Sequence, residues 1–245
     1  MTIQEDGWLS SVMERPVFRV DAKQPGDAAA VREHLAGRTG YYFAKVDAAD
    51  VALTKELLRA GFYVADVCVT FAVAPGRLIG GANPTVDVGT LPGGPDHDRI
   101  ESEVLAIAHD SFRFTRFHLD PLVSRATADL VKKEWVRNYA EGKRGDHLFV
   151  ATTGGRATGF LAALRSHDGA TAIIDLVGVH PDAQRQGVGR TMITRFAEHY
   201  RDARELLVGT QVANTPSVQL YESLGFRLKS SQYVLHMHVR EGELL

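Results

Sequence analysis

The segment QRQGVGR, residues 184–190, places two glycines and a run of backbone amides at the start of an amphipathic helix. Amide donors and the positive end of a helix dipole together form a binding site for an anion such as phosphate. A Walker loop would end in Gly-Lys-Ser/Thr, but Gly189 is followed by Arg190 and Thr191. A dinucleotide-binding loop would need a third glycine where Met192 stands. Neither of these two phosphate-binding loops fits the segment.

The same segment fits a third pattern, Gln/Arg-x-x-Gly-x-Gly/Ala, and two further motifs surround it. The preceding strand ends in VGVHP, residues 177–181, close to a Leu-x-Val-x-Pro pattern. Downstream, residues 214–226 match the signature Asn-x-x-Ala/Ser-x-x-x-Tyr-x-x-x-Gly-Phe. With these three motifs in this order, the chain resembles the GCN5-related N-acetyltransferases (GNAT). The resemblance implies an α/β fold, with a mixed central sheet and flanking helices, and acetyl-CoA as co-substrate.

The resemblance also implies roles for single residues. In the family, the loop wraps the pyrophosphate of coenzyme A, and the strand before it splays from its neighbour and binds the pantetheine arm. The backbone N–H of Val179 is then the candidate donor to the oxyanion, and Tyr221 is the general acid that protonates the leaving sulfur. Tyr221 has the alternative role of a helix residue packing on the sheet, and Asn214 that of a helix N-cap. The expected cofactor-binding residues are Val177, Val179, Gln184, Arg185, Gln186, Gly187, Val188, Gly189, Arg190, Asn214 and Ser217.

The general base and a metal site have weaker signals in the sequence. Asp175 is expected to share a strand face with Val177 and Val179, where its carboxylate would face the acceptor amine; the alternative is a solvated strand residue. His236 and His238 share a strand face near the end of the chain, without an adjacent cysteine or carboxylate. Two histidines alone rarely hold a metal, so we predict no metal site.

The acceptor is predicted from the segment HDSFRFTRFHLD, residues 109–120, which lies between two expected helices. Aromatic rings stack on bases or sugars, and arginines clamp a diphosphate; a hydrophobic staple with solvated arginines is the alternative. Loose similarity over most of the chain to bacterial dTDP-fucosamine acetyltransferases implies a nucleotide-linked deoxy-amino sugar as acceptor. The expected substrate-binding residues are Arg113, Arg116, Phe117 and His118.

The composition excludes several other classes of function. The 245 residues carry 28 basic and 30 acidic side chains without a basic stripe, so nucleic acid is a poor candidate partner. No apolar run approaches the ~18 residues of a membrane span, and the first residues lack the features of a signal peptide. The single cysteine, Cys68, lies in an apolar run and suits a buried position in a reducing cytoplasm. We therefore expect a cytoplasmic protein that acts on a small-molecule amine, as a monomer or a homodimer.

Gly and Pro make residues 80–95 the strongest candidate linker, since they disfavour both helix and strand. It would separate a small α/β domain, residues 1–79, from a GNAT domain, residues 96–245. In the second part the periodicity predicts helices from Ile100 and from Asp120-Pro121, then three strands, a helix, a strand, a helix and two strands. The first part repeats the end of the second faintly, so it is a candidate degenerate half-copy.

The sequence therefore predicts an acetyl-CoA-dependent N-acetyltransferase acting on the amine of a nucleotide-linked sugar. Two alternatives stay open at this point. In the first, the chain is an acetyltransferase whose acceptor is a peptide or protein amine or an aminoglycoside. In the second, the chain is a non-catalytic acyl-CoA-binding module. The presence of Tyr221 argues against the second alternative, because a protein that only binds acyl-CoA needs no proton donor at sulfur.

Overall fold

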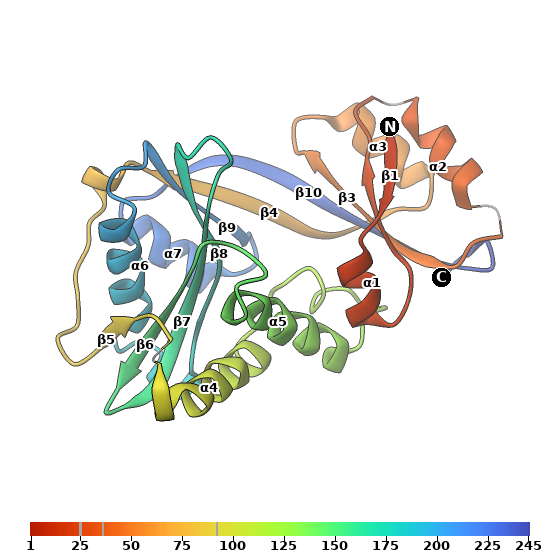
Figure 1. Ribbon diagram of the computed structural model, residues 1–245. Coiled ribbons are helices and arrows are strands. Elements are labelled where there is room, and N and C mark those ends of the chain that lie inside the picture. Colours follow the sequence, from red (N-terminus) through yellow and green to blue (C-terminus); the bar gives the residue numbers. More distant parts are fainter. Residues whose placement is uncertain (25, 36, 92) are drawn as a thin grey trace.

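A computed structural model of the chain describes residues 1–24, 26–35, 37–91 and 93–245 (Figure 1). The first part comprises β1 (Thr2–Glu5), α1 (Gly7–Met13), β2 (Val17–Asp21), α2 (Asp27–Leu35), β3 (Gly40–Asp47), α3 (Val51–Arg59) and β4 (Tyr63–Val73). The second part comprises β5 (Asp87–Gly89), α4 (His97–Asp110), α5 (Arg125–Ala140), β6 (His147–Thr153), β7 (Arg156–Arg165), β8 (Thr171–Val179), α6 (Val188–His199), β9 (Glu205–Gln211), α7 (Thr215–Ser223), β10 (Arg227–Arg240) and β11 (Glu243–Leu244). Short 3-10 turns occupy Pro75–Arg77, Gly94–Asp96 and Pro181–Ala183.

One sheet runs through both parts, in the order β1-β2-β3-β10-β4-β9-β8-β7-β6-β5, with β11 paired to β10. The two parts interleave in its middle, because β4 lies between β9 and β10 while β10 lies between β3 and β4. Figure 1 shows these two long strands crossing the molecule side by side. The expected mixed sheet with flanking helices is confirmed. The division into domains at residues 80–95 remains a prediction, and a boundary there leaves β4 in the sheet of the second part.

Helices cover both faces of the strands β6–β9 (Figure 1). Side chains alternate along β6 and β7, as expected of strands covered on both faces. Leu148 and Phe160 pack with α4 and α5, whereas Phe149 and Leu161 pack with α6 and α7. Each fully buried side chain of this size stabilises the fold by about 1.5–3 kcal/mol. Among the helices in the described ranges, none has the length and apolar character that crossing a bilayer requires.

The last predicted pair of strands is a single strand, β10, in the structure. The two predicted strands meet at Ser230 and Ser231, which pair with Thr70 and Val69 of β4. The pairing with β4 is irregular between Leu228 and Ser230. Continuous pairing with β4, a strand far away in the sequence, joins the two segments into one strand.

The predicted start of α5 at Asp120-Pro121 is also wrong. The helix begins at Arg125, with Ser124 as its N-cap, and the Ser124 hydroxyl accepts a hydrogen bond from the Thr127 amide at 3.1 Å. The Asp120 carboxylate is instead bound by two histidines of β10. Oδ1 also accepts from the Leu122 amide at 2.8 Å, so Asp120 caps a turn that precedes the helix.

Candidate active site

The parallel strands β8 and β9 separate part-way along their length. They pair from Thr171 and Glu205 up to Ile174 and Val208, and from there to their ends at Val179 and Gln211 the described structure contains no further pairs between them. On its other side β8 stays paired with β7 up to Val179. The edge of β8 that faces β9 is therefore open to an extended ligand, which would bind to it as an added strand does.

The glycine loop lies at this open end and leads directly into α6. Gly187 is the N-cap with φ 80°, a left-handed conformation that suits glycine, and no side chain caps the helix. Arg185 also has a positive φ, 63°. Gly189 faces α7, since a Cβ atom at this position would lie 3.4 Å from Leu220 Cδ2, at ordinary contact distance. The amides of the first turn, together with the helix dipole, form a site that fits a pyrophosphate.

The segment before β5 holds this loop in place. Asn83 Nδ2 donates to the Gln186 carbonyl at 2.8 Å, and the Asn83 amide donates to Thr191 Oγ1 at 2.9 Å. The Arg190 guanidinium donates to Ser223 Oγ at 2.8 Å, which ties α6 to α7. Its side chain is thus engaged within the protein, and its backbone amide is what it offers to a phosphate. Asn83 was missed by the sequence reasoning, because a single Asn in a Gly/Pro-rich segment carries no signal.

Helix α7 brings the predicted general acid to the same end of the sheet. Asn214 is its N-cap, with Oδ1 accepting from the Ser217 amide at 3.4 Å. Tyr221 is 2% exposed and packs against Phe71 and Phe226, with ring centroids 6.1 and 5.9 Å away. Burial raises the pKa of Tyr221, and a hydrogen bond with the Ser217 side chain opposes that rise. The phenol is therefore protonated at neutral pH, as a general acid must be, and the packing role is present as well.

Asp175 does not lie on the predicted strand face. The register between β7 and β8 shifts at this point, since Ala163 pairs with Ile174 and Ala162 pairs with Leu176. Asp175 is thus the extra residue of a β-bulge, which changes the side that the following residues face. Leu176 packs with the α4–α5 side, whereas Val177 and Val179 pack with the α6–α7 side. The expectation that Asp175 shares a face with these valines is wrong for this reason.

The Asp175 carboxylate is held by three donors from the α5 region. Oδ2 accepts from Trp135 Nε1 at 2.9 Å, from the Tyr139 hydroxyl at 2.7 Å and from Arg144 Nε at 2.9 Å. Burial alone would raise the pKa of Asp175, but the hydrogen bonds from Arg144, Tyr139 and Trp135 together lower it. A carboxylate held in this way is a weak base, and its contacts favour a role in positioning these three side chains.

A second carboxylate, Asp66 on β4, was not found from the sequence. It is 6% exposed, and Oδ2 is buried without a hydrogen-bond partner among the described residues. Burial raises the pKa of Asp66 to about 6, while hydrogen bonds with the Gln211 side chain and the Val67 amide, and then the charges of Lys45 and Arg116, oppose the rise. Asp66 and Lys45 both lie opposite Val234 of β10. A buried carboxylate with such a pKa suits a general base near neutral pH.

Four charged side chains gather around this point, and we call them the α5-side cluster: Lys45, Asp66, Arg116 and Lys132. The Arg116 guanidinium carbon lies 3.9 Å from the Phe43 ring centroid and 4.5 Å from that of Phe117. Lys132 Nζ lies 5.7 Å from the same Phe117 centroid. Of the four residues predicted to bind the substrate, Arg116 is therefore the one that belongs to this charged cluster.

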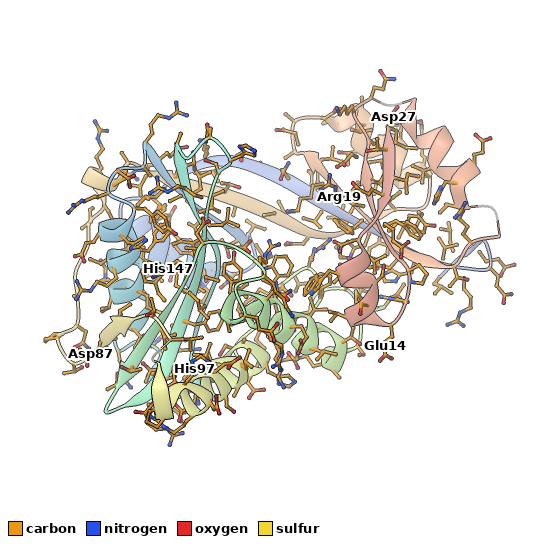
Figure 2. All side chains as sticks on the ribbon, viewed as in Figure 1. Glu14, Arg19, Asp27, Asp87, His97 and His147 are labelled. Carbon is orange, nitrogen blue, oxygen red and sulfur yellow. The ribbon has the colours of Figure 1, made fainter. Side chains whose placement is uncertain are left out.

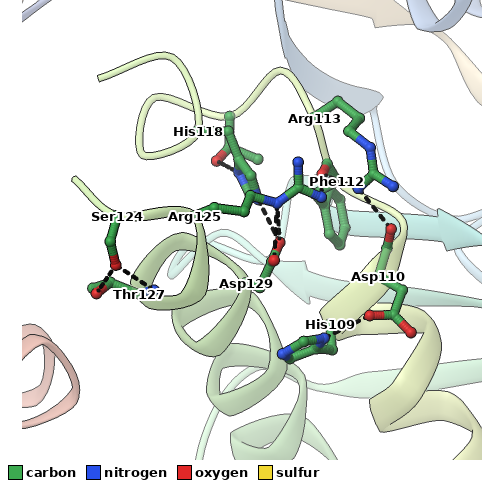
Figure 3. A network of polar contacts seen from close by, with 10 residues as sticks. His109, Asp110, Phe112, Arg113, His118, Ser124, Arg125, Thr127 and Asp129 are labelled. Atoms are coloured by element: carbon green, nitrogen blue, oxygen red, sulfur yellow. Dashed lines mark hydrogen bonds and ion pairs between the residues drawn. The ribbon is translucent and has the colours of Figure 1, made fainter. Parts of the chain in front are cut away.

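The other three predicted substrate residues have partners within the protein, and Figure 3 shows those of Arg113 and His118. Arg113 Nη1 donates to the carbonyls of Asp110 and Phe112, at 2.7 and 2.8 Å, and so covers the end of α4. Phe117 is 1% exposed and belongs to a core cluster. His118 Nε2 lies 2.9 Å from Asp129 Oδ1, and burial lowers the pKa of His118. These contacts weigh against direct ligand contacts from these three side chains, whose binding role stays a prediction.

Asp120, His236 and His238 form a buried group where the two parts meet, so the histidines do have the carboxylate companion that the sequence did not reveal. Asp120 Oδ2 lies 2.6 Å from His236 Nδ1 and 2.9 Å from His238 Nε2, and Oδ1 accepts from the Tyr63 hydroxyl at 2.7 Å. Burial opposes ionisation, but these hydrogen bonds together hold the pKa of Asp120 well below its usual range. Burial lowers the pKa of His236 to about 4.

The hydrogen bonds of this group do not fit a metal ion. Arg15 Nη1 lies 3.1 Å from His238 Nδ1, and because arginine only donates, that nitrogen must accept. We therefore assign the proton of His238 to Nε2, where it is donated to Asp120 and leaves no lone pair for a metal. The other nitrogen of His236, Nε2, lies 2.8 Å from the Tyr41 hydroxyl. We interpret the group as a buried polar junction between β3, β4 and β10.

Comparison with known proteins identifies the family. The sequence model of the Acetyltransferase (GNAT) family matches residues 104–226, about half of the chain, and this range includes the splayed strands, the glycine loop and Tyr221. The chain belongs to the GNAT acetyltransferase family. In solved structures, a GCN5-related N-acetyltransferase from Kribbella flavida superposes with a TM-score of 0.59 at 15% identity, covering 90% of this chain and 80% of that one. At this level of identity the similarity shows the fold alone.

Among curated GNAT-like relatives, the spore coat polysaccharide biosynthesis protein SpsD of Bacillus subtilis is 30% identical over 146 residues, 59% of this chain and 50% of that protein. The L-amino acid N-acyltransferase MnaT of Escherichia coli is 33% identical over 87 residues, 34% of this chain and 51% of that protein. The chain thus spans about half of the length of these two relatives. GNAT proteins use acetyl-CoA, and the open first turn of α6 and the splayed edge of β8 fit its pyrophosphate and its extended arm.

Proposed function

We propose that this GNAT protein transfers the acetyl group of acetyl-CoA to the primary amine of a nucleotide-linked deoxy-amino sugar. One observation carries the acetyl transfer: the uncapped first turn of α6, the open edge of β8 and the phenol of α7 lie at one end of the sheet. The hydrogen bond from Arg190 to Ser223 links the phosphate end of this arrangement to the helix that carries Tyr221.

In the proposed mechanism the amine attacks the thioester carbonyl directly. Asp66 takes up a proton from the acceptor ammonium, which leaves the nitrogen lone pair free to form the new N–C bond. The Val179 amide stabilises the negative charge on the carbonyl oxygen. As the C–S bond breaks, Tyr221 gives its proton to the departing sulfur. The second proton that the new amide nitrogen loses passes through solvent to the tyrosinate and restores the phenol. Asp175, the base expected from the sequence, is proposed instead to position Trp135, Tyr139 and Arg144 beside the acceptor.

The sugar acceptor rests on two supports. SpsD, the relative with the longest match given above, is named for polysaccharide biosynthesis. The α5-side cluster also offers cations that suit a diphosphate, whereas a polycationic aminoglycoside would favour an acidic surface. A peptide amine and an amino acid remain the acceptors to test against it, the second because of the similarity to MnaT.

We further propose that residues 1–79 are a degenerate half-copy of the GNAT domain whose present role is to shape the acceptor site. Lys45 of β3 and Asp66 of β4 support this role, because both belong to that part, while the charge of Lys45 acts on Lys132 and the charge of Arg116 acts on Asp66. A cytoplasmic location and a homodimer are further parts of the proposal, and gel filtration with light scattering would test the second.

Thiol release from acetyl-CoA tests the proposal directly. The protein is mixed with acetyl-CoA and with separate panels of dTDP- and UDP-linked amino sugars, peptides, amino acids and aminoglycosides. Release with a nucleotide-linked sugar, and none with the other panels, is the expected result. Release with peptides or amino acids alone would replace the proposed acceptor. Tight CoA binding without release on any amine would instead favour an acyl-CoA-binding module.

A further inference from the structure

Arg116 forms no ion pair with an acidic side chain among the described residues. Its guanidinium stacks between the rings of Phe43 and Phe117, and its Nη1 atom is buried without a hydrogen-bond partner in the part of the chain that the structure describes. Asp66 is near enough for the charge of Arg116 to act on it, but the two side chains form no ion pair in the described structure. A buried guanidinium nitrogen without an acceptor is costly, because the lost hydration is not replaced.

Lys132 is a second buried cation beside the first. It is 8% exposed, and its Nζ atom faces three rings, at 4.9 Å from the Trp135 centroid and 5.7 Å from those of Phe112 and Phe117. Burial and then the charge of Arg116 lower the pKa of Lys132 to about 7. The other charged groups around it are Asp175, which favours the charged form, and Lys45 and Arg144, which oppose it. Asp175 already accepts three hydrogen bonds on Oδ2 and so offers Lys132 only partial compensation.

Two neighbouring buried cations that share one aromatic ring repel each other, and an anion bound between them would remove both the repulsion and the missing hydrogen bond. We propose that Arg116 and Lys132 form an anion site that holds a phosphate of the acceptor, on the α5 side of the sheet and separate from the glycine loop. The planar guanidinium with its several donors and the compact charge of the ammonium together suit the oxygens of a phosphate or diphosphate.

The same cluster also provides for the amine. Asp66 Oδ2, buried and unpartnered among the described residues, is an acceptor that suits an ammonium group. The cluster therefore fits a ligand that carries an amine and an anion in one molecule, as a nucleotide-linked amino sugar does. This inference rests on the proposed function in naming the acceptor as the source of the phosphate, while the anion site itself can be tested without any acetyl transfer.

Pyrophosphate binding, measured by calorimetry on protein saturated with CoA, tests the site. Saturation with CoA blocks the glycine loop, so that pyrophosphate has only the second site to occupy. We expect binding to wild type and at least a tenfold loss in both Arg116→Gln and Lys132→Met, with wild-type binding in Lys133→Met, whose lysine lies next to Lys132 in the sequence. Folding is checked by circular dichroism, and the two variants on different elements guard against one that does not fold.

A proton count in the same experiment adds a second readout. Repeating it at pH 8 in two buffers of different ionisation enthalpy should show proton uptake in wild type, because a bound anion raises the pKa of Lys132, and none in Lys132→Met. Two results would overturn the anion site. One is pyrophosphate binding to the CoA-free protein that is lost once the protein is saturated with CoA. The other is wild-type pyrophosphate binding in both Arg116→Gln and Lys132→Met. Pyrophosphate binding at the site without acetylation of any nucleotide-linked sugar would remove the proposed acceptor and leave the anion site standing. Equal binding of acetate would assign the site to carboxylates in place of phosphates.

Discussion

The two parts of the chain place a similar unit, a parallel pair of strands with helices, on either side of the central strands β4 and β10. From the central pair β4–β10, the sheet continues through β9 and β8 on one side and through β3 and β2 on the other, and both β2–β3 and β8–β9 are parallel. At the start of α6, Gly187 leaves the first turn uncapped. Asp27 is the first residue of α2 (Figure 2). Its carboxylate accepts hydrogen bonds from the amides of Lys23 and Gln24 at 2.8 and 3.3 Å. The Asp27 carboxylate thus has backbone amide donors from the segment before its helix, whereas the first-turn amides of α6 lack a side-chain cap.

The short helices α3 and α7 begin alike and differ in one buried side chain. Asp50 caps α3 as Asn214 caps α7, with hydrogen bonds of 3.0 and 3.4 Å to the amides of Leu53 and Ser217. Seven residues after each cap stands a buried residue, Leu57 at 0% and Tyr221 at 2% exposure. The packing role is common to both positions, and the phenol is present in only one of them. Both positions are buried, and Tyr221 differs from Leu57 in its hydroxyl group, which the proposed mechanism uses.

Replacing the phenol should have the largest effect. We expect Tyr221→Phe to lower turnover at least tenfold with the Kd for CoA unchanged, because the ring still packs while the proton donor is lost. The matched change in the other unit, Leu57→Met, conserves volume and should leave turnover within about twofold. Steady-state kinetics and CoA titration measure both. Equal turnover in Tyr221→Phe and wild type would reduce Tyr221 to the packing role of Leu57.

Asp66→Asn should lower kcat/KM about tenfold at pH 7.5, since the amide cannot take up a proton. In wild type, kcat/KM should rise with pH through about 6, where the raised pKa of Asp66 lies, and this rise should be absent from the variant. Because burial disfavours the charged form, wild type loses stability as the pH rises from 3.8 through about 6, and the variant should unfold at an equal or higher temperature at pH 8. A pH profile unchanged by the substitution would exclude Asp66 as the base.

Gly187→Ala should weaken CoA binding about fivefold, because alanine is strained at a φ of 80° and shifts the amides of the first turn. Gly76→Ala, at a position with open space around it, is the matched control and should bind CoA as wild type does. Calorimetric titration compares the two. Wild-type affinity in Gly187→Ala would mean that the geometry of this turn does not matter for the ligand.

Asp27→Ala should have the smallest effect, a lowering of the unfolding temperature by a few degrees with CoA affinity unchanged. The hydrogen bond from the Lys23 amide lowers the pKa of Asp27, so its stabilisation is present above pH 3.8 and is lost as the pH falls through the lowered pKa. Thermal unfolding at pH 7 and in acid measures the difference. If Asp27→Ala bound a second molecule of CoA, the absence of a ligand site in the first part would depend on this one carboxylate, and the two units would differ less than we infer.

The sequence predicted those features that depend on local patterns. The glycine loop lies between a strand and a helix, as expected, and the family and the mixed sheet are confirmed. The residues that would hold CoA stay predictions, although the Gly187 turn and the Asn214 cap are placed where that role needs them. The glycine turn and the Asn214 cap are local features, because glycine and capping residues act directly on the backbone of their neighbours.

The features that the sequence did not reveal depend on distant contacts. The bulge at Asp175 comes from pairing with β7, and the unbroken β10 comes from pairing with β4. Asp120 seemed to be a helix cap because its histidine partners lie more than a hundred residues away. Asp66 lies in an apolar run that reads as an ordinary strand, and only the packing of Arg116 and Lys45 around it marks it as a candidate for chemistry.

A crystal structure of the complex with CoA would test the central claim most directly. We predict that the pyrophosphate oxygens accept hydrogen bonds from the amides of Gly187 and Gly189, that the arm lies along the open edge of β8, and that the sulfur lies within hydrogen-bond reach of the Tyr221 hydroxyl. A pyrophosphate bound elsewhere, or a sulfur separated from Tyr221 by packed side chains, would contradict the account.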